Sequence, residues 1–236
     1  QPALDEVSYD TGRRIVTMKT DGTKIPFRWL SLSITQSTSI DSNSKDAKSQ
    51  AASVIGPNII NYIRGDRTNE KPAGANYRPR GHVLGDIIHS RPLFVDHPTD
   101  PRVYVGANDG MLHSFDADSG DEVFAYVPSF FVSPVAATSF SNIKALLVDP
   151  YAHNYFVDAS PNARKAGSQT VLVGGVGAGG KGLYALDITD PTAATEAAAA
   201  TKILWEITPD QRPSCLQKLE ELCRRANLLL AEVEHH

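Results

Sequence analysis

The feature that most limits the fold of this chain is an internal repeat. Residues 103–127 and residues 171–191 show the same order of features, about 70 residues apart. Each copy begins with an apolar strand that ends in glycine, at Gly106 in the first copy and Gly174 in the second. In both copies this strand is followed by a turn and an apolar–aromatic strand that ends in aspartate. A polar turn and a further apolar–aromatic strand come next. Repeated units bury their apolar faces against one another, so the pattern predicts stacked antiparallel sheets.

The second copy contains a glycine-rich run that has the spacing of a phosphate-binding loop. Gly175 to Lys181 follow the order G-x-x-x-x-G-K. A P-loop also needs Ser or Thr after the lysine to hold Mg²⁺, and a helix whose N-terminus faces the phosphates. Here Gly182 follows the lysine, and the next residues, L-Y-A-L-D, alternate like a strand. In the first copy the same place holds Asn108-Asp109-Gly110, a hairpin turn signal. We therefore expect a glycine-shaped turn and no nucleotide site.

The order of strands and turns is typical of a β-propeller blade and resembles most the quinoprotein type. Blades of that type follow approximately V-Y-V-G-x-x-D-G-x-L-x-A-x-D-x-x-T-G-x-x-x-W. Phe124 stands where the first copy would have the tryptophan, and Trp205 fills that position in the second. In such blades the aspartate and the tryptophan tie neighbouring blades together. We assign a structural role in the blades to Gly106, Asp109, Gly110, Asp116, Gly174, Asp187 and Trp205.

We expect a mainly β fold, an incomplete β-propeller of about two antiparallel blades. The expected domains are a lead-in at residues 1–80 with strands and a short helix, a partial propeller at 81–208, and a helical tail at 209–236 unrelated to the propeller. In the tail a leucine stripe at helical spacing replaces the strand pattern. The tail therefore looks foreign to the fold: frame-shifted, truncated or appended.

Within the lead-in, residues 12–19 and 25–34 have the alternation of strands. Residues 35–53 are rich in Ser, Thr, Asp and Lys and predict a solvated loop. Gly56-Pro57 opens a short helix, and Gly65 is placed for a left-handed cap at its end. Residues 191–201, rich in alanine, predict a loop with helical tendency.

Composition excludes several classes of function. The chain has 236 residues and a formal net charge of -4, with scattered Lys and Arg, so we expect no nucleic-acid partner. No stretch approaches the roughly 18 apolar residues that a transmembrane helix needs. The first residues lack the pattern of a signal peptide and an initiator Met, so we expect the chain to be part of a longer protein.

Four motifs together resemble the start of the C-terminal domain of the PilC/PilY-type proteins of type IV pili. They are N-Y-I-R-G-D-R (61–67), Y-R-P-R-G-H-V-L-G-D-I-I-H-S-R-P (77–92), V-Y-V-G-A-N-D-G-M-L-H-S-F-D (103–116) and V-G-A-G-G-K-G-L-Y-A-L-D-I-T-D-P (176–191). The resemblance covers roughly residues 10–208. It implies a factor for pilus assembly and extension and a tip-associated adhesin without catalysis.

The resemblance also implies partners and a location. The expected partners are pilins or minor pilins and a host-surface receptor. The expected location is the cell surface, the outer membrane or the pilus tip of a Gram-negative bacterium. The family's calcium-binding loop lies in later blades, so we expect no cofactor within this chain.

The enzyme alternative is a blade of a quinoprotein-type dehydrogenase that uses pyrroloquinoline quinone. The sequence has no adjacent Cys pair and no acid set for calcium plus cofactor, and its seven His are dispersed. Asp116, Asp118 and Asp121 begin like a calcium loop but lack a third spaced ligand and the terminal Glu, which favours a solvated turn. We therefore assign no catalytic, cofactor-binding or metal-binding residue. A weaker possibility is a generic propeller scaffold for protein partners.

Arg64-Gly65-Asp66 is the tripeptide that integrins recognise on exposed loops. It is a possible integrin-type adhesion motif. The structural alternative is a helix end capped by Gly65, with Arg64 placed favourably near the C-terminal dipole.

Overall fold

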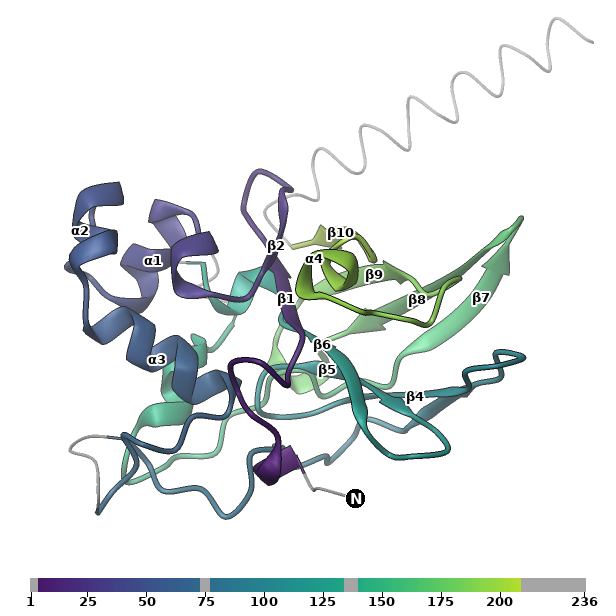
Figure 1. Ribbon diagram of the computed structural model, residues 1–236, viewed down its shortest axis with the longest axis horizontal. Helices are drawn as coiled ribbons and strands as arrows, with labels where there is room; N and C mark the ends of the chain where they lie inside the picture. The colour runs from purple at the N-terminus through teal and green to yellow at the C-terminus, as the bar shows by residue number, and fades with distance from the viewer. Residues whose placement is uncertain (1–3, 73–76, 134–139, 209–236) are drawn as a thin grey trace, which may run out of the picture. The chain divides into compact units, whose positions relative to one another are not determined.

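The computed structural model describes residues 4–72, 77–133 and 140–208 (Figure 1). The chain divides into two units, Gln1–Glu206 and Ile207–His236. The helical tail predicted at residues 209–236 lies outside the described residues.

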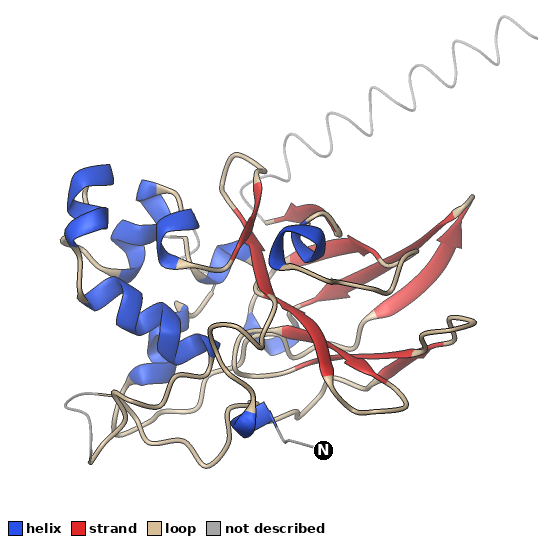
Figure 2. Cartoon of the chain, viewed as in Figure 1, coloured by secondary structure: helices blue, strands red, loops and turns tan. Residues whose placement is uncertain are grey.

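Two β-sheets dominate the described residues (Figure 2). The first has the strand order β2-β1-β6-β5-β4-β3, and the second has the order β10-β9-β8-β7. The strands are β1 Ile15–Met18, β2 Lys24–Pro26, β3 Leu93–Val95, β4 Arg102–Gly106, β5 Leu112–Asp116, β6 Glu122–Tyr126, β7 Asn162–Ala166, β8 Gln169–Gly175, β9 Leu183–Asp187 and β10 Ile203–Ile207. Each copy of the repeat lies in its own sheet, and the mainly β prediction is confirmed.

The hairpins β4–β5 and β8–β9 pair in the same register. Gly106 pairs with Leu112 at the turn end of the first hairpin, and Gly175 pairs with Leu183 at the same point of the second. The sequence alignment, which matches Gly106 with Gly174, is therefore one residue off. The reason is the turn, which has seven residues between the paired positions of the second hairpin and five in the first.

The two sheets pack against each other, one above the other in Figure 1. The rings of Tyr126 on β6 and Tyr184 on β9 have centroids 5.2 Å apart. Leu112 pairs directly with Tyr126, so both side chains lie on the face that the second sheet covers. All three side chains are fully buried. Each copy of the repeat thus covers an apolar face of the other.

The lead-in completes the first sheet. Strand β1 pairs in parallel with β6, placing Ile15 opposite Ala125, and pairs antiparallel with β2. Helix α4, Glu196–Ala200, lies in the alanine-rich stretch 191–201 and packs against β1 and β2. The lead-in and both repeats therefore share one hydrophobic core.

The loop predicted at residues 35–53 is wrong. This stretch contains most of helix α1, Ile34–Ile40, and all of α2, Ala47–Ala52. Each helix begins with a capping box, formed by Ser33 with Gln36 and by Asp46 with Ser49. These caps satisfy backbone N–H groups at the helix start and offset the weak helix propensity of Ser and Thr.

The strand predicted at residues 25–34 is also too long. Strand β2 ends at Pro26, and a short 3-10 helix, Trp29–Ser31, follows it. Leu32, one of the alternating apolar residues of this stretch, is buried, whereas Leu30 is 71% exposed.

The helix predicted from Gly56-Pro57 is confirmed as α3, Ile55–Arg64. Ile59, Ile60 and Ile63 are buried on one side. Gly65 has a φ of 124°, and its N–H donates to the carbonyls of Asn61 and Tyr62. This is the positive-φ helix end that favours glycine.

Candidate functional site

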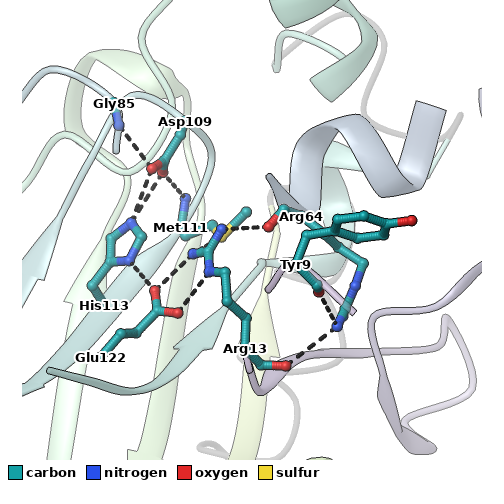
Figure 3. Close-up of polar contacts among 8 residues, drawn as sticks. All are labelled: Tyr9, Arg13, Arg64, Gly85, Asp109, Met111, His113 and Glu122. Atoms are coloured by element: carbon teal, nitrogen blue, oxygen red, sulfur yellow. Dashed lines mark hydrogen bonds and ion pairs between the residues drawn. The ribbon is translucent and has the colours of Figure 1, made fainter. Parts of the chain in front are cut away.

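Four charged side chains meet inside the protein and form a charge network (Figure 3). Arg13 precedes β1, Asp109 lies in the β4–β5 turn, His113 lies on β5 and Glu122 begins β6. Arg13 donates from Nε and Nη2 to the two oxygens of Glu122, at 2.7 Å each. His113 Nδ1 lies 2.8 Å from Glu122 Oε1, and its Nε2 lies 3.0 Å from Asp109 Oδ2. The side chains of Arg13, His113 and Glu122 are at most 2% exposed.

The geometry requires a doubly protonated His113. Each ring nitrogen faces a carboxylate, which only accepts hydrogen bonds, so both nitrogens must donate. Burial lowers the pKa of His113, but the charges and hydrogen bonds of Asp109 and Glu122 outweigh it and raise the pKa to about 9. Burial likewise acts to raise the pKa of Glu122, yet Arg13 and His113 hold it far below its usual range. His113 and Glu122 are thus both charged at neutral pH.

Asp109 links the network to the connection that leads into the first sheet. Its carboxylate accepts from the backbone N–H of Gly85 at 2.9 Å and of Met111 at 3.1 Å. A Cβ on Gly85 would lie 2.3 Å from the backbone nitrogen of Asp109, so the close approach requires glycine. Gly110 has a φ of 94°, which also favours glycine in this turn.

We expect the network to make stability depend on pH. The pKa of His113 is about 9 in the folded protein against 6.5 in an unfolded chain. Its contribution is therefore complete below pH 6.5 and lost as pH rises through 9, by about 3 kcal/mol in total. Urea unfolding at pH 6.5 and pH 9.5 measures the loss, and His113→Gln should show a clearly smaller one. Equal losses in both proteins would contradict the assignment.

Arg64-Gly65-Asp66 lies beside the network and is buried. Arg64 is 1% exposed, and Asp66 is 8% exposed. The carbonyl of Arg64 accepts from Arg13 Nη1 at 2.7 Å. The Arg64 guanidinium donates to three backbone carbonyls, those of Tyr9, Arg13 and Phe27. The structure does not present this tripeptide on an exposed loop, so a receptor would reach it only after the helix end had opened.

Two of the predicted blade glycines allow close packing. A Cβ on Gly106 would lie 2.3 Å from the carbonyl oxygen of Val157. A Cβ on Gly174 would lie 2.2 Å from the ring of Tyr184. Both distances are below any real Cβ contact, so glycine lets Val157 lie against β4 and lets the Tyr184 ring lie over β8 within its own sheet.

The predicted blade aspartates stabilise their own turns. Asp116 accepts from the backbone N–H of Ser119 at 2.8 Å, and Asp187 accepts from that of Thr189 at 3.0 Å. Asp116 also pairs with Arg102 on the adjacent strand at 2.7 Å. These contacts stay within one sheet each. Trp205 is 38% exposed.

Hydrogen bonds that link β10 of the second sheet to β6 of the first are made instead by Glu206, a residue that was not predicted from the sequence. Its carboxylate on β10 accepts from the hydroxyls of Tyr126 and Ser129 and from the backbone N–H of Ser129 at 2.8 Å. Burial raises the pKa of Glu206 and outweighs these hydrogen bonds, which act to lower it. Burial, followed by the nearby Glu206 charge, raises the pKa of Tyr126 well above its usual value.

The glycine run forms a turn between strands. Gly177–Gly179 make a short 3-10 turn, and strand β9 follows at Leu183 where a P-loop would have a helix. In the part of the chain that the structure describes, no three His, Cys, Asp or Glu side chains gather as a metal site would need. No helix there is long and apolar enough to span a membrane.

Comparison with known proteins identifies the family. Residues 90–221 match the family described as the PilY1 beta-propeller domain. The type IV pilus biogenesis factor PilY1 of Pseudomonas aeruginosa strain PAK is 36% identical over 247 residues, which cover 90% of this chain and 20% of that protein. A PilY1 homolog of Xylella fastidiosa is 37% identical over 179 residues, 63% of this chain and 14% of that protein.

The chain spans about a fifth of the length of the Pseudomonas aeruginosa relatives that it matches. No solved structure matches it. The match to the propeller domain covers both copies of the repeat and strands β3 to β10, and it leaves out β1 and β2 of the lead-in. The chain therefore belongs to the PilY1 family, as the four sequence motifs predicted.

Proposed function

We propose that this chain serves type IV pilus assembly and extension as part of a surface-exposed protein, and that its sheets form a scaffold for adhesive contacts. The observation that carries the proposal is the 36% identity, over 90% of the chain, to a protein named as a type IV pilus biogenesis factor. The proposed location is the cell surface or pilus tip, and the proposed partners are pilins or minor pilins and a host-surface receptor. The quinoprotein dehydrogenase alternative is not favoured by the family assignment.

The charge network supports a scaffold. Its members neutralise one another inside the protein, and Arg13, His113 and Glu122 have almost no exposed surface. Buried charges that are paired in this way hold segments of chain together. The Arg13–Glu122 pair joins residues 109 positions apart, and it fixes the lead-in onto the first sheet.

The assembly role is tested in a Gram-negative host that carries the parent gene with these residues. Replacing the segment that corresponds to residues 90–208 with a short Gly/Ser linker should reduce sheared surface pilin at least tenfold. Attachment to host cells is then measured per assembled pilus. Unchanged piliation, with the truncated protein present at wild-type amount, would refute the assembly role.

The same assay separates adhesion from the buried tripeptide. Asp66→Glu keeps Gly65 as the helix end, so we expect unchanged piliation and unchanged attachment. A selective loss of integrin-dependent attachment in this variant, with piliation intact, would show that Arg64-Gly65-Asp66 acts in adhesion.

A further inference from the structure

A polar cavity of about 150 Å³ lies beside the charge network, under the connection that leads into the first sheet. Its lining includes Arg78, Arg80, His82, Asp86, Asn108 and Tyr151. The volume is well below the roughly 300–1,000 Å³ of pockets that take drug-sized ligands. The cavity therefore suits one small ring or the end of a longer ligand.

One wall of the cavity combines an aromatic ring with an available donor. The guanidinium carbon of Arg78 lies 3.8 Å from the ring centroid of Tyr151. Arg78 Nε donates to the carbonyl of Leu146 at 3.0 Å, which fixes the side chain. Among the described residues, the Arg78 side chain donates from Nε and stacks on Tyr151, and its two terminal nitrogens have no hydrogen bond or ion pair there. They remain available to a ligand.

A carboxylate with a fixed orientation lies in the same lining. Asp86 Oδ2 accepts from Asn108 Nδ2 at 3.0 Å and from His153 Nε2 at 2.8 Å. Its Oδ1 accepts from no other side chain within the described ranges, and the side chain is 48% exposed. Asp86 thus offers a positioned acceptor, with Arg78 as a donor in the same cavity.

A row of rings leads from the cavity across the surface. Tyr151 is followed by His153 with ring centroids 6.2 Å apart, then by Tyr155 at 4.7 Å and by His89 at 5.8 Å. His153 and His89 are 37% and 61% exposed. Exposed aromatic faces next to polar groups favour ligands that have an apolar face and a polar edge.

We propose that this cavity and the adjacent row of rings bind a carbohydrate, with one sugar ring in the cavity. A free anion is disfavoured because Asp86 and Asp109 line the cavity, and a cation is disfavoured by Arg78 and Arg80. A neutral sugar meets neither penalty. Its hydroxyls both donate and accept, which matches a guanidinium and a carboxylate, and its C–H face can pack on the exposed rings of the adjacent row.

The inference deepens the proposed adhesive role and rests on it only for the biological source of the sugar. Binding is measured on the purified chain, without pili or cells. A failure of the site would leave the assembly result untouched, and a failure of pilus assembly would leave the binding result untouched.

The test is saturation-transfer NMR of the 236-residue chain with free galactose, glucose, mannose, N-acetylglucosamine and N-acetylgalactosamine. We expect at least one of these sugars to bind with a millimolar Kd. Asp86→Asn and Arg78→Gln should each weaken that binding at least fivefold, because each removes one of the two fixed polar partners. Asp96→Asn, an exposed acid outside the cavity lining, is the matched control and should bind as the wild type does.

Thermal unfolding of each variant shows whether it folds. The two cavity variants change the charge in opposite directions, so if one of them fails to fold, the other still tests the site. Absence of binding by all five sugars to the folded wild-type chain would overturn the proposal. So would binding that stays unchanged in both folded cavity variants.

Discussion

Replacing Glu122 by Gln should be among the most damaging single substitutions in this chain, with a loss of about 3–5 kcal/mol in the free energy of unfolding. The change leaves Arg13 and His113 buried and charged, with only Asp109 to balance them. Breaking one partner of a buried ion pair has a cost of this order. Domains are stable by roughly 5–15 kcal/mol, so this loss is a large fraction of the total stability. Urea unfolding at pH 7 measures the effect.

The matched control is Asp118→Asn, an exposed acid in the turn just before β6. It should change stability by less than about 0.5 kcal/mol. Arg13→Met should lower the free energy of unfolding less in the Glu122→Gln variant than in the wild-type protein. In the variant it removes a buried cation that has already lost its partner. A Glu122→Gln protein as stable as the control would show that the network contributes no net stability.

Local signals explain what the sequence could predict. The alternation of V-Y-V-G and L-Y-A-L-D, bounded by glycine turns, was enough to place β4, β5, β8 and β9. Gly65 after an apolar helical face was enough to place the end of α3. The helices α1 and α2 were missed because their polar composition outweighed a signal that was present, S-x-x-Q at Ser33 and D-x-x-S at Asp46.

The site was not predictable because it is assembled from distant residues. Arg13 and Glu122 are 109 positions apart, and nothing near either residue indicates the other. His113 did carry a weak signal, since it is a titratable residue within an otherwise apolar strand. Tyr151 and Asp86 come together only because two irregular connections run side by side, and periodicity has no bearing on such segments.

The two copies of the repeat differ most in what covers them. Leu112 and Leu183 occupy equivalent places in the two hairpins. Leu112 is fully buried under the second sheet, whereas Leu183 is 47% exposed. Val173, on the same face as Leu183, is 38% exposed. Trp205 lies on this face too, because Glu206, the next residue of β10, points at the first sheet.

We therefore expect the chain in isolation to self-associate through this outer face of the second sheet. An exposed apolar face of a sheet whose equivalent is buried in the same molecule is an association site. Sedimentation velocity over a concentration series should show oligomers, and Leu183→Lys should shift the distribution to monomer with little loss of stability. Leu112→Lys is the matched contrast and should unfold the protein, because its lysine would be buried without a partner. A wild-type chain that stays monomeric at high concentration, with a sharp cooperative unfolding transition, would mean that this face is covered in solution.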